Sequence, residues 1–361
     1  MTRSAATTIA IVPHEKFSVT RQSLQSVLTG TPEPYRLVYV DGGSPRHVAQ
    51  YLEAQARIHD FTLIRTEHFL QPNEGRNLAL AYVDTEFVVL LDNDVVVDPG
   101  WLTQLERCAH ETGAAVVSPL CCIGPVVHAR VHLTTGECEI IEANGRRVMH
   151  ERFVDSQASL ADVLSRVERV QCGLVDAHSL LVRSDALTRD PPFDEAIRLE
   201  EHIDLSLTVR EGGGSLWLEP RAIVTYLTPR LQPSDLPYYV LRWSDAWNRA
   251  GLAHLAEKWR ISTDDPWLDE KTAWATTHRH RGYLPYRSPL KRLWRHYGRE
   301  VRPIVDRVAQ PLALRYHGRR RFRELVPRLV HAASWVRDSM RLSNETVAPC
   351  QVTREYTASP R

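Results

Sequence analysis

Two carboxylates, one residue apart, stand at the end of an apolar run and could hold a divalent cation. Residues 87–91 are Phe-Val-Val-Leu-Leu, and Asp92, Asn93 and Asp94 follow them. Side chains at positions i and i+2 of an extended segment point to the same face, so Asp92 and Asp94 can converge on one Mg²⁺ or Mn²⁺ while Asn93 turns away. Such an ion usually shares its other positions with water and with the phosphates of a ligand. The motif therefore indicates a phosphate-bearing substrate.

The same three residues also suit a turn. Short polar side chains bond their own backbone where a strand ends, and for an isolated Asp-x-Asp motif the turn is the commoner interpretation. The apolar run before Asp92, and its place within an alternating α/β pattern, favour the metal interpretation.

The segments around Asp92 alternate between strand and helix patterns. Strands are expected at residues 9–12, 35–40, 61–65 and 87–91, and helices at 19–28, 48–58 and 76–83, with a loop at 71–75. This alternation predicts βαβ units and a mostly parallel sheet. Asp41, followed by Gly42 and Gly43, places another carboxylate at a strand end, where open α/β sheets bind ligands.

The pattern changes twice after residue 100. A helix at 101–112 and a strand at 114–119 are followed at 126–153 by short β-prone runs with an Asn144-Gly145 turn, which predicts a β-hairpin insertion. A strand at 179–183, a polar helix at 199–210 and a strand at 215–224 complete the sheet. From residue 233 the strand patterns end and Trp, Arg and His increase. We therefore expect a catalytic domain at 1–232, a basic helical region at 233–342 and a disordered tail at 343–361.

Composition excludes some classes of protein. The 361 residues are 43% hydrophobic and 25% charged with a net charge of +1, which predicts a folded core and gives no general case for nucleic-acid binding. Six cysteines without C-x-x-C spacing indicate reduced thiols and a cytoplasmic location. No apolar stretch suits a signal peptide or a membrane span.

The C-terminal region has a local excess of positive charge. Residues 291–328 contain twelve Lys and Arg and three acids, mixed with bulky apolar side chains. This pattern suits a peripheral contact with an anionic membrane surface, at the inner face of the cell membrane. A solvated helical appendage or an oligomer contact is the alternative.

Several motifs in order resemble a family 2 glycosyltransferase with the GT-A fold, over residues 8–228. The matching segments are the opening strand with Pro13, Asp41-Gly42-Gly43-Ser44, Asn73-Glu74-Gly75-Arg76-Asn77, Asp92-Asn93-Asp94, and Pro192-Phe193-Asp194-Glu195 followed by Glu200 to Arg210.

The resemblance implies a fold, an activity and a donor site. The fold is α/β, a Rossmann-like, mostly parallel sheet flanked by helices, with a β-hairpin insertion and a C-terminal helical appendage. The activity is metal-dependent, inverting transfer of a sugar from a nucleoside-diphosphate sugar to a hydroxyl of a glycan, a lipid-linked saccharide or a small molecule. The implied metal is Mn²⁺ or Mg²⁺ on Asp92 and Asp94. The implied donor or nucleotide contacts are Pro13, Glu15, Asp41, Arg76, Asn77, Asp92 and Asn93.

Transfer also needs a base that takes the proton of the acceptor hydroxyl. Alignment of Asp204-Leu205 with the family pattern places Glu201 at its first acid and His202 where the family has an Asp. We favour Glu201 as the base, then His202, then Glu200. Alternatively, the acids complement the dipole at the start of a helix.

Other candidates come from loops. Asp176 and His178 precede the strand at 179–183, on the side where an acceptor approaches in this fold, although a structural role is the alternative. Tyr226 stands where some relatives carry a late His ligand, so a third protein ligand for the metal stays open. His128 and His132 lie in a β-prone stretch, where positions i and i+4 are far apart, and we predict no zinc site there.

Two other functions stay open. An apolar strand before Asp-x-Asp-x-Val also describes the nucleophile loop of haloacid-dehalogenase-type phosphatases, here on Asp92 and Asp94. In that case the motif would follow three strands, and the expected downstream Lys and acidic pair are not evident. A catalytically inactive, nucleotide-binding scaffold is the non-enzyme alternative. The sequence names neither the donor sugar and nucleotide nor the acceptor.

Overall fold

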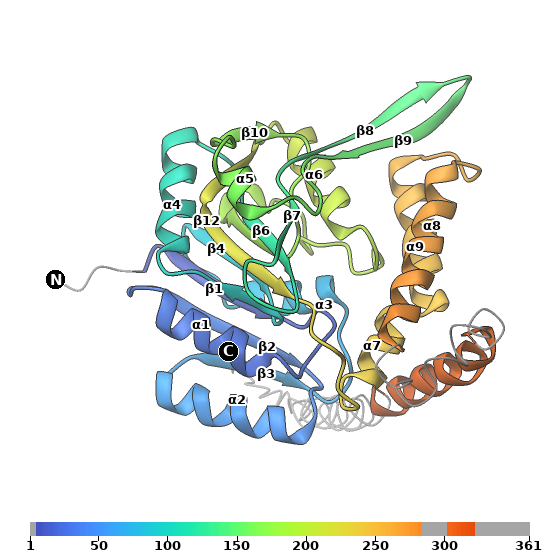
Figure 1. The fold of residues 1–361 in the computed structure, drawn as a ribbon, viewed down its shortest axis with the longest axis horizontal. Coiled ribbons are helices and arrows are strands. Elements are labelled where there is room, and N and C mark those ends of the chain that lie inside the picture. Colours follow the sequence, from blue (N-terminus) through green and yellow to red (C-terminus); the bar gives the residue numbers. More distant parts are fainter. Residues whose placement is uncertain (1–4, 284–301, 322–361) are drawn as a thin grey trace, which may run out of the picture.

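The fold is built on a ten-stranded mixed sheet (Figure 1). The structure, a computed structural model, describes residues 5–283 and 302–321, so the tail expected at 343–361 lies outside the described residues. Eight strands follow the order β10, β12, β6, β11, β4, β1, β2, β3, while β5 pairs with β12 and β7 with β6. The strands are β1 Thr7–Val12, β2 Arg36–Gly42, β3 Thr62–Thr66, β4 Phe87–Asp92, β5 Val95–Val97, β6 Val116–Gly124, β7 Arg130–Leu133, β10 Val170–Cys172, β11 Ser179–Arg183 and β12 Leu216–Leu227.

Helices cover both faces of this sheet. The apolar side chains of α1, α2 and α4 join one core cluster, and those of α3 and α6 join a second cluster on the other face. Strands β1 to β4 are mutually parallel, whereas β11 runs antiparallel between β4 and β6. The expected α/β sheet with flanking helices is confirmed. These helices are α1 Thr20–Gly30, α2 Arg46–His59, α3 Pro72–Leu80, α4 Trp101–Thr112 and α6 Glu201–Glu211, and the short α5 Leu160–Leu164 lies before β10.

Helix α3 begins earlier than its sequence pattern predicts. Pro72 occupies its first turn, and Gln71 and Glu74 form a capping box in which the Gln71 backbone donates to Glu74 Oε2 at 2.9 Å. A proline is accepted at this position because the first helical amides have no partner within the helix. The loop expected at 71–75 is therefore wrong, and Arg76 lies inside the helix.

The expected hairpin insertion is formed by β8 Gly136–Ala143 and β9 Arg146–Phe153, which form a separate two-stranded sheet and project from the main sheet (Figure 1). The hairpin contacts the turn between two later helices: Ser262 N donates to Arg147 O at 2.8 Å, and Met149 N donates to Asp265 Oδ2 at 2.7 Å. The insertion therefore braces the C-terminal helices.

Helices follow β12. They are α7 Leu236–Arg242, α8 Asp245–Trp259, α9 Pro266–Gly282 and a helix over 302–321. A third core cluster joins α7, α8 and α9 to α6 and to the hairpin. In the described part of the chain, no helix combines the length and the apolar character needed to cross a membrane.

Candidate active site

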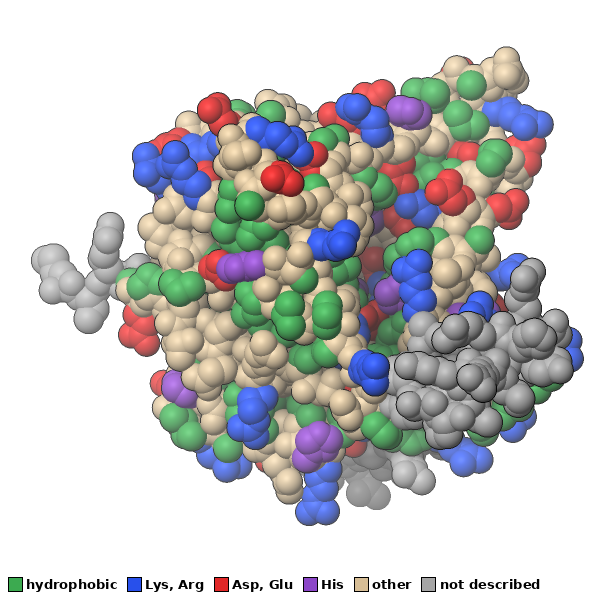
Figure 2. Space-filling view, viewed as in Figure 1, with side chains coloured by type: hydrophobic (Ala, Val, Ile, Leu, Met, Phe, Trp, Pro, Cys, Tyr) green, Lys and Arg blue, Asp and Glu red, His purple; other side chains and the backbone are tan. Residues whose placement is uncertain are grey.

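A cleft of about 1360 Å³ lies between the sheet and the C-terminal helices. Figure 2 shows this hollow, with acidic, basic and histidine side chains inside it. One side is formed by the segment after β1, the end of β4 and the loop before β11. The other side comes from α7 and α9, and the start of α6 lies between them. Loops at the carboxyl ends of parallel strands are the usual ligand side of such sheets.

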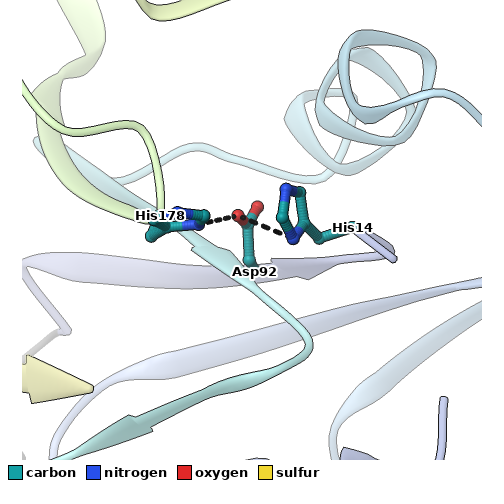
Figure 3. A group of neighbouring side chains, drawn as sticks. All are labelled: His14, Asp92 and His178. Atoms are coloured by element: carbon teal, nitrogen blue, oxygen red, sulfur yellow. Dashed lines mark hydrogen bonds and ion pairs between the residues drawn. The ribbon is translucent and has the colours of Figure 1, made fainter. Parts of the chain in front are cut away.

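Asp92 is the centre of a small cluster on the sheet side (Figure 3). Its Oδ2 accepts a hydrogen bond from His178 Nδ1 at 2.9 Å and lies 3.7 Å from His14 Nδ1, while Arg76 Nη2 is 3.8 Å from Oδ1. Burial would raise the pKa of Asp92, but His14, His178 and Arg76 together lower it. Asp92 is therefore held as a carboxylate facing the cleft.

Asn93 and Asp94 form a turn after β4, as the alternative interpretation of the motif expected, and the extended backbone ends at Asp92. The Asn93 amide turns away from the cleft: its Oδ1 accepts from His14 N and its Nδ2 donates to Lys16 O, both at 3.0 Å. Asp94 is completely buried and its Oδ2 lies 3.3 Å from His14 Nδ1. Both carboxylates thus contact one imidazole.

This cluster has the chemistry of a divalent cation site. One ligand atom each from His14, Asp92 and His178 lie within 4.8 Å of one another. Imidazoles are common ligands of first-row transition metals, and a carboxylate is a common ligand of Mn²⁺, so this donor set suits a first-row divalent ion. In addition, Asp94 Oδ1 is buried and has no hydrogen-bond partner among the described residues. The residues present therefore fit a bound metal ion.

Three neighbouring residues at the start of α6, Glu200, Glu201 and His202, line the cleft beside α7 and α9. Glu200 occupies the N-cap position of the helix. Its backbone is left-handed with φ of 61°, a conformation that is uncommon for a non-glycine residue. Glu201 Oε1 accepts from Arg242 Nη2 at 2.9 Å, whereas Glu200 Oε2 lies 3.4 Å from Lys271 Nζ and 3.7 Å from His202 Nε2.

The two glutamates differ in their pKa. Burial raises the pKa of Glu200, and Lys271 and His202 offset this only in part. Burial also acts on Glu201, but Arg242 and Arg76 lower the pKa of this carboxyl. Glu200 is therefore the more basic of the two carboxylates.

Glu15 connects the first strand to the last helices. It is 1% exposed and accepts hydrogen bonds from Tyr226 Oη, from Trp243 Nε1 at 2.7 Å and from His278 Nε2 at 3.0 Å. Lys16 also pairs with Glu15, and burial lowers the pKa of Lys16 to about 8, against the attraction of Asp94 and Asp235. Glu15 lines the cleft, but these partners occupy most of the hydrogen-bond acceptor positions of its carboxylate.

The other donor-side candidates have different positions. Arg76 lines the cleft and donates to Asn73 at 2.9 Å. Asn77 braces the segment before α6, since it donates to Phe193 O at 2.8 Å and accepts from Phe193 N at 3.0 Å. Pro13 packs against Gly42 so closely that a Cβ there would lie 2.8 Å from the proline ring.

Asp41 lies outside the wall that the described residues form around this cleft. Its carboxylate is buried and accepts from Ser44 N and Ser44 Oγ, both at 2.9 Å, and from Arg65. The helix over 302–321 covers the neighbouring backbone, where Arg320 Nη1 donates to Gly43 O at 3.1 Å. The strand end that was expected to hold the nucleotide therefore contacts the helix over 302–321.

The two acceptor-side candidates lie on the sheet side. Asp176 Oδ2 is 2.5 Å from His132 Nδ1, and its Oδ1 accepts from His178 N at 3.0 Å. His178 points to Asp92 rather than towards α7 and α9. His128 pairs instead with Asp98 at 2.8 Å.

Sequence patterns missed several residues of the cleft. His14 stands between Pro13 and Glu15, both of which were candidates, so its position could have drawn attention. Arg242, Lys271 and His278 carry no spacing signal, because each reaches its carboxylate partner from a helix that is remote in sequence.

Comparisons with known proteins agree with this architecture. Residues 8–156 match the family described as "Glycosyl transferase family 2". The "Pre-mycofactocin glycosyltransferase" of Mycobacterium tuberculosis, strains CDC 1551 and H37Rv, is 28% identical over 193 residues, which are 53% of this chain and 37% of that relative. This chain therefore spans well under half the length of these curated relatives.

A solved structure shows a similar fold. The crystal structure of GalNAc-T7 with UDP, GalNAc and Mn²⁺ superposes with a TM-score of 0.50 at 14% identity, covering 81% of this chain and 58% of that chain. At this identity the likeness concerns the fold alone.

Proposed function

We propose that this chain is a family 2 glycosyltransferase that transfers a sugar from a nucleoside-diphosphate sugar to an acceptor hydroxyl with inversion, and the family match of residues 8–156 supports this proposal. The observation that carries the proposal is the cleft itself. A metal-type cluster around Asp92 lies on its sheet side, and two buried glutamates face it from α6. Transfer from a diphosphate donor needs both parts, one for the leaving group and one for the acceptor.

On the donor side we propose that Asp92, His14 and His178 hold Mn²⁺ or Mg²⁺. Asp94, which we expected to be the second ligand, orients His14 through the contact at 3.3 Å. When bound, the metal neutralises charge on the departing diphosphate. Arg76 adds a fixed positive charge beside Asp92.

On the acceptor side we propose Glu200 as the general base. The sequence pattern favours Glu201, but Arg242 holds that carboxylate and lowers its pKa. Glu200 keeps a raised pKa and lines the cleft, which suits a group that must accept a proton. Lys271, 3.4 Å away, favours its ionised form.

The proposal is tested with the full chain, Mn²⁺ and a panel of UDP-, GDP- and dTDP-sugars, with detection of donor hydrolysis and of transfer to saccharide and lipid-linked acceptors. We expect one donor class to turn over, and Asp92→Asn and Glu200→Gln each to lower this turnover at least about 100-fold. Glu53→Gln, which changes an exposed carboxylate on α2, is the control. Turnover of phosphomonoesters alone would establish the phosphatase function instead, and nucleotide binding without any turnover would establish a scaffold.

We also propose that the chain binds an anionic membrane surface through the helix over 302–321. Ile304, Val308, Leu312 and Tyr316 recur every four residues and are 58%, 58%, 58% and 47% exposed. The helix also carries exposed Arg307, Arg315, Arg319 and Arg321, whereas its one acid, Asp306, faces α9. Exposed apolar and basic side chains on one helix are typical of an interfacial helix.

Cosedimentation with phosphatidylserine and phosphatidylcholine vesicles tests this contact. The chain should bind the phosphatidylserine-containing vesicles at low salt. The double variant Val308→Asp, Leu312→Asp should no longer cosediment with them. Ile58→Asp, on α2 and 68% exposed, is the matched control and should still bind. Equal sedimentation of the double variant would overturn the proposal. Lack of binding combined with concentration-dependent dimerisation would show that a second copy covers this face.

A further inference from the structure

One face of α9 lines the cleft and carries an exposed tryptophan. Trp274 is 45% exposed, although it lies in the wall of the cleft. Glu270, Lys271, His278 and Arg281 line the same cleft at helical spacing. Positions three or four residues apart on a helix share a face, so this stripe is a continuous surface.

The indole of Trp274 is held in place from behind. The His278 ring stacks on it with centroids 5.1 Å apart and an interplanar angle of 28°, and the Trp243 ring meets it edge-on at 5.3 Å. His278 is fixed in turn by Glu15 at 3.0 Å. A large aromatic side chain with this support, left open to a cleft, offers a rigid apolar platform to a ligand.

Two charged side chains stand on either side of this platform. Glu270 lies one turn before Trp274 and Arg281 about two turns after it, and both are exposed. Neither side chain makes a hydrogen bond or an ion pair with another residue in 5–283 or 302–321, whereas Lys271 is paired with Glu151 and Glu200. Glu270 and Arg281 are therefore available to a ligand.

The platform is also close to the proposed base. Lys271, three residues before Trp274 on α9, lies 3.4 Å from Glu200. Three residues advance a helix axis by about 4.5 Å, so Trp274 lies about one turn from Lys271 on the face of α9 that lines the cleft with Glu200. Its position corresponds to the acceptor side, across the cleft from Asp92.

We infer that Trp274, Glu270 and Arg281 form a subsite for a saccharide acceptor, whose ring stacks on the indole while its hydroxyls bond the two charged side chains. This inference rests on the proposed function, because it names the acceptor class of the same cleft. A sugar ring combines an apolar C–H face with hydroxyls around its edge. An aromatic peptide side chain or an acyl chain would use the indole but would leave Glu270 and Arg281 without partners.

Saturation-transfer NMR tests the subsite without any donor. The full chain is mixed with methyl glucosides, maltose, cellobiose and N,N′-diacetylchitobiose, with and without UDP and Mn²⁺. We expect at least one saccharide to bind. Trp274→Ala should weaken that binding about tenfold, equivalent to about 1.4 kcal/mol, while Trp274→Phe should retain most of it. Tyr82→Ala, at an exposed aromatic residue outside the cleft, should have no effect.

Three results would overturn the inference. In the first, Trp274→Ala binds saccharides as well as the parent chain does. In the second, the parent chain binds none of the saccharides. In the third, a tyrosine-containing tripeptide competes for the site and no saccharide does. Thermal-shift measurements with UDP and Mn²⁺ should be the same for Trp274→Ala and for the parent chain. Saccharide binding that depends on Trp274 in a chain without donor turnover would support the subsite and contradict the proposed function.

Discussion

At the residue scale, neighbouring side chains shift the pKa values of two buried carboxylates of the cleft in opposite directions. Asp92 is surrounded by His14, His178 and Arg76, which lower its pKa although it is buried. Glu200 is equally buried, but its cationic neighbours offset the desolvation only in part, so its pKa is raised. A carboxylate with a low pKa suits a metal ligand, whereas one with a raised pKa suits proton transfer.

The metal assignment predicts unequal effects at neighbouring positions. Asp92→Asn and His178→Ala should each weaken Mn²⁺ binding about 10- to 100-fold or more, because each removes a proposed ligand. Asp94→Asn should have a smaller effect, since Asp94 acts through His14. Titration of Mn²⁺ by electron paramagnetic resonance, in the presence of UDP, measures this directly. A larger loss in Asp94→Asn than in Asp92→Asn would show that Asp94 is the principal ligand.

The base assignment predicts the pH profile of transfer. Glu200 must be ionised to accept a proton, so kcat/KM should fall as the pH decreases through its pKa, which burial raises above the ordinary value of about 4.3. Glu200→Gln should lower kcat about 10²- to 10⁴-fold and remove this acidic limb. Glu201→Gln should keep the limb. The reverse result would assign the base to Glu201, and loss of the limb only in His202→Gln would assign it to the imidazole.

At the element scale, the parts of the fold with strong local patterns could be predicted from the sequence. The alternation around Phe87 and the turn at Asn144-Gly145 depend on neighbouring residues, and β4 and the β8–β9 hairpin lie where they were expected. The start of α3 was misplaced, because Gln71 and Pro72 suit a loop as well as a helix cap. Both alternatives satisfy the local backbone, and only contacts with other elements decide between them.

The sequence indicated cleft residues on the sheet side and at the start of α6, but none on α7 or α9. Asp92 and Arg76 come from segments whose strand and helix patterns are clear. Arg242 meets Glu201 across 41 residues, and His278 meets Glu15 across 263 residues. These pairs depend on how helices pack after the sheet has formed, and one sequence carries no periodic signal for such packing. For the same reason the sequence offered three candidates for the proposed base without deciding among them.

The pair formed by Arg242 and Glu201 joins α7 to α6 and predicts a stability effect. Both side chains are buried, with 3% and 8% exposed, so Arg242→Met should leave an uncompensated carboxylate and cost about 3–5 kcal/mol. Adding Glu201→Gln should recover part of the loss. Urea unfolding measures both variants. Arg107→Met, which breaks an exposed pair with Glu111, is the control and should cost about 1 kcal/mol or less. An equal loss of unfolding free energy in Arg242→Met and Arg107→Met would contradict this interpretation of the buried pair.

At the scale of the whole molecule, the cleft exists because the C-terminal helices are fixed to the sheet at several points. Glu15 links the end of β1 to α7 and α9, and the third core cluster joins these helices to α6 and the hairpin. The helix over 302–321 adds a further link, since Asp306 contacts α9 and Arg320 reaches Gly43 after β2. Both sides of the cleft are therefore positioned by one continuous set of contacts.

This arrangement predicts that loss of Asp306 releases the helix over 302–321. Asp306 accepts from Arg279 Nε at 3.0 Å and Nη2 at 2.8 Å, from His280 at 2.7 Å and from Tyr283 at 3.0 Å. Arg279 is 1% exposed, so Asp306→Ala leaves part of a buried guanidinium without a partner. Hydrogen exchange should become faster in 302–321 and at the end of α9, but not in β1 or β4. Asp269→Ala, an exposed acid on α9, is the control.

Acidification should act in the same direction as the substitution. Burial would raise the pKa of Asp306, but Arg279 and His280 lower it below the ordinary aspartate value of about 3.9. The contact therefore stabilises the folded helix above that value and weakens as the pH falls through the lowered pKa. Exchange in 302–321 should rise on acidification in the parent chain and change much less in Asp306→Ala, once the intrinsic pH dependence of exchange is subtracted. Equal changes in both chains would mean that groups other than Asp306 hold this helix against the sheet.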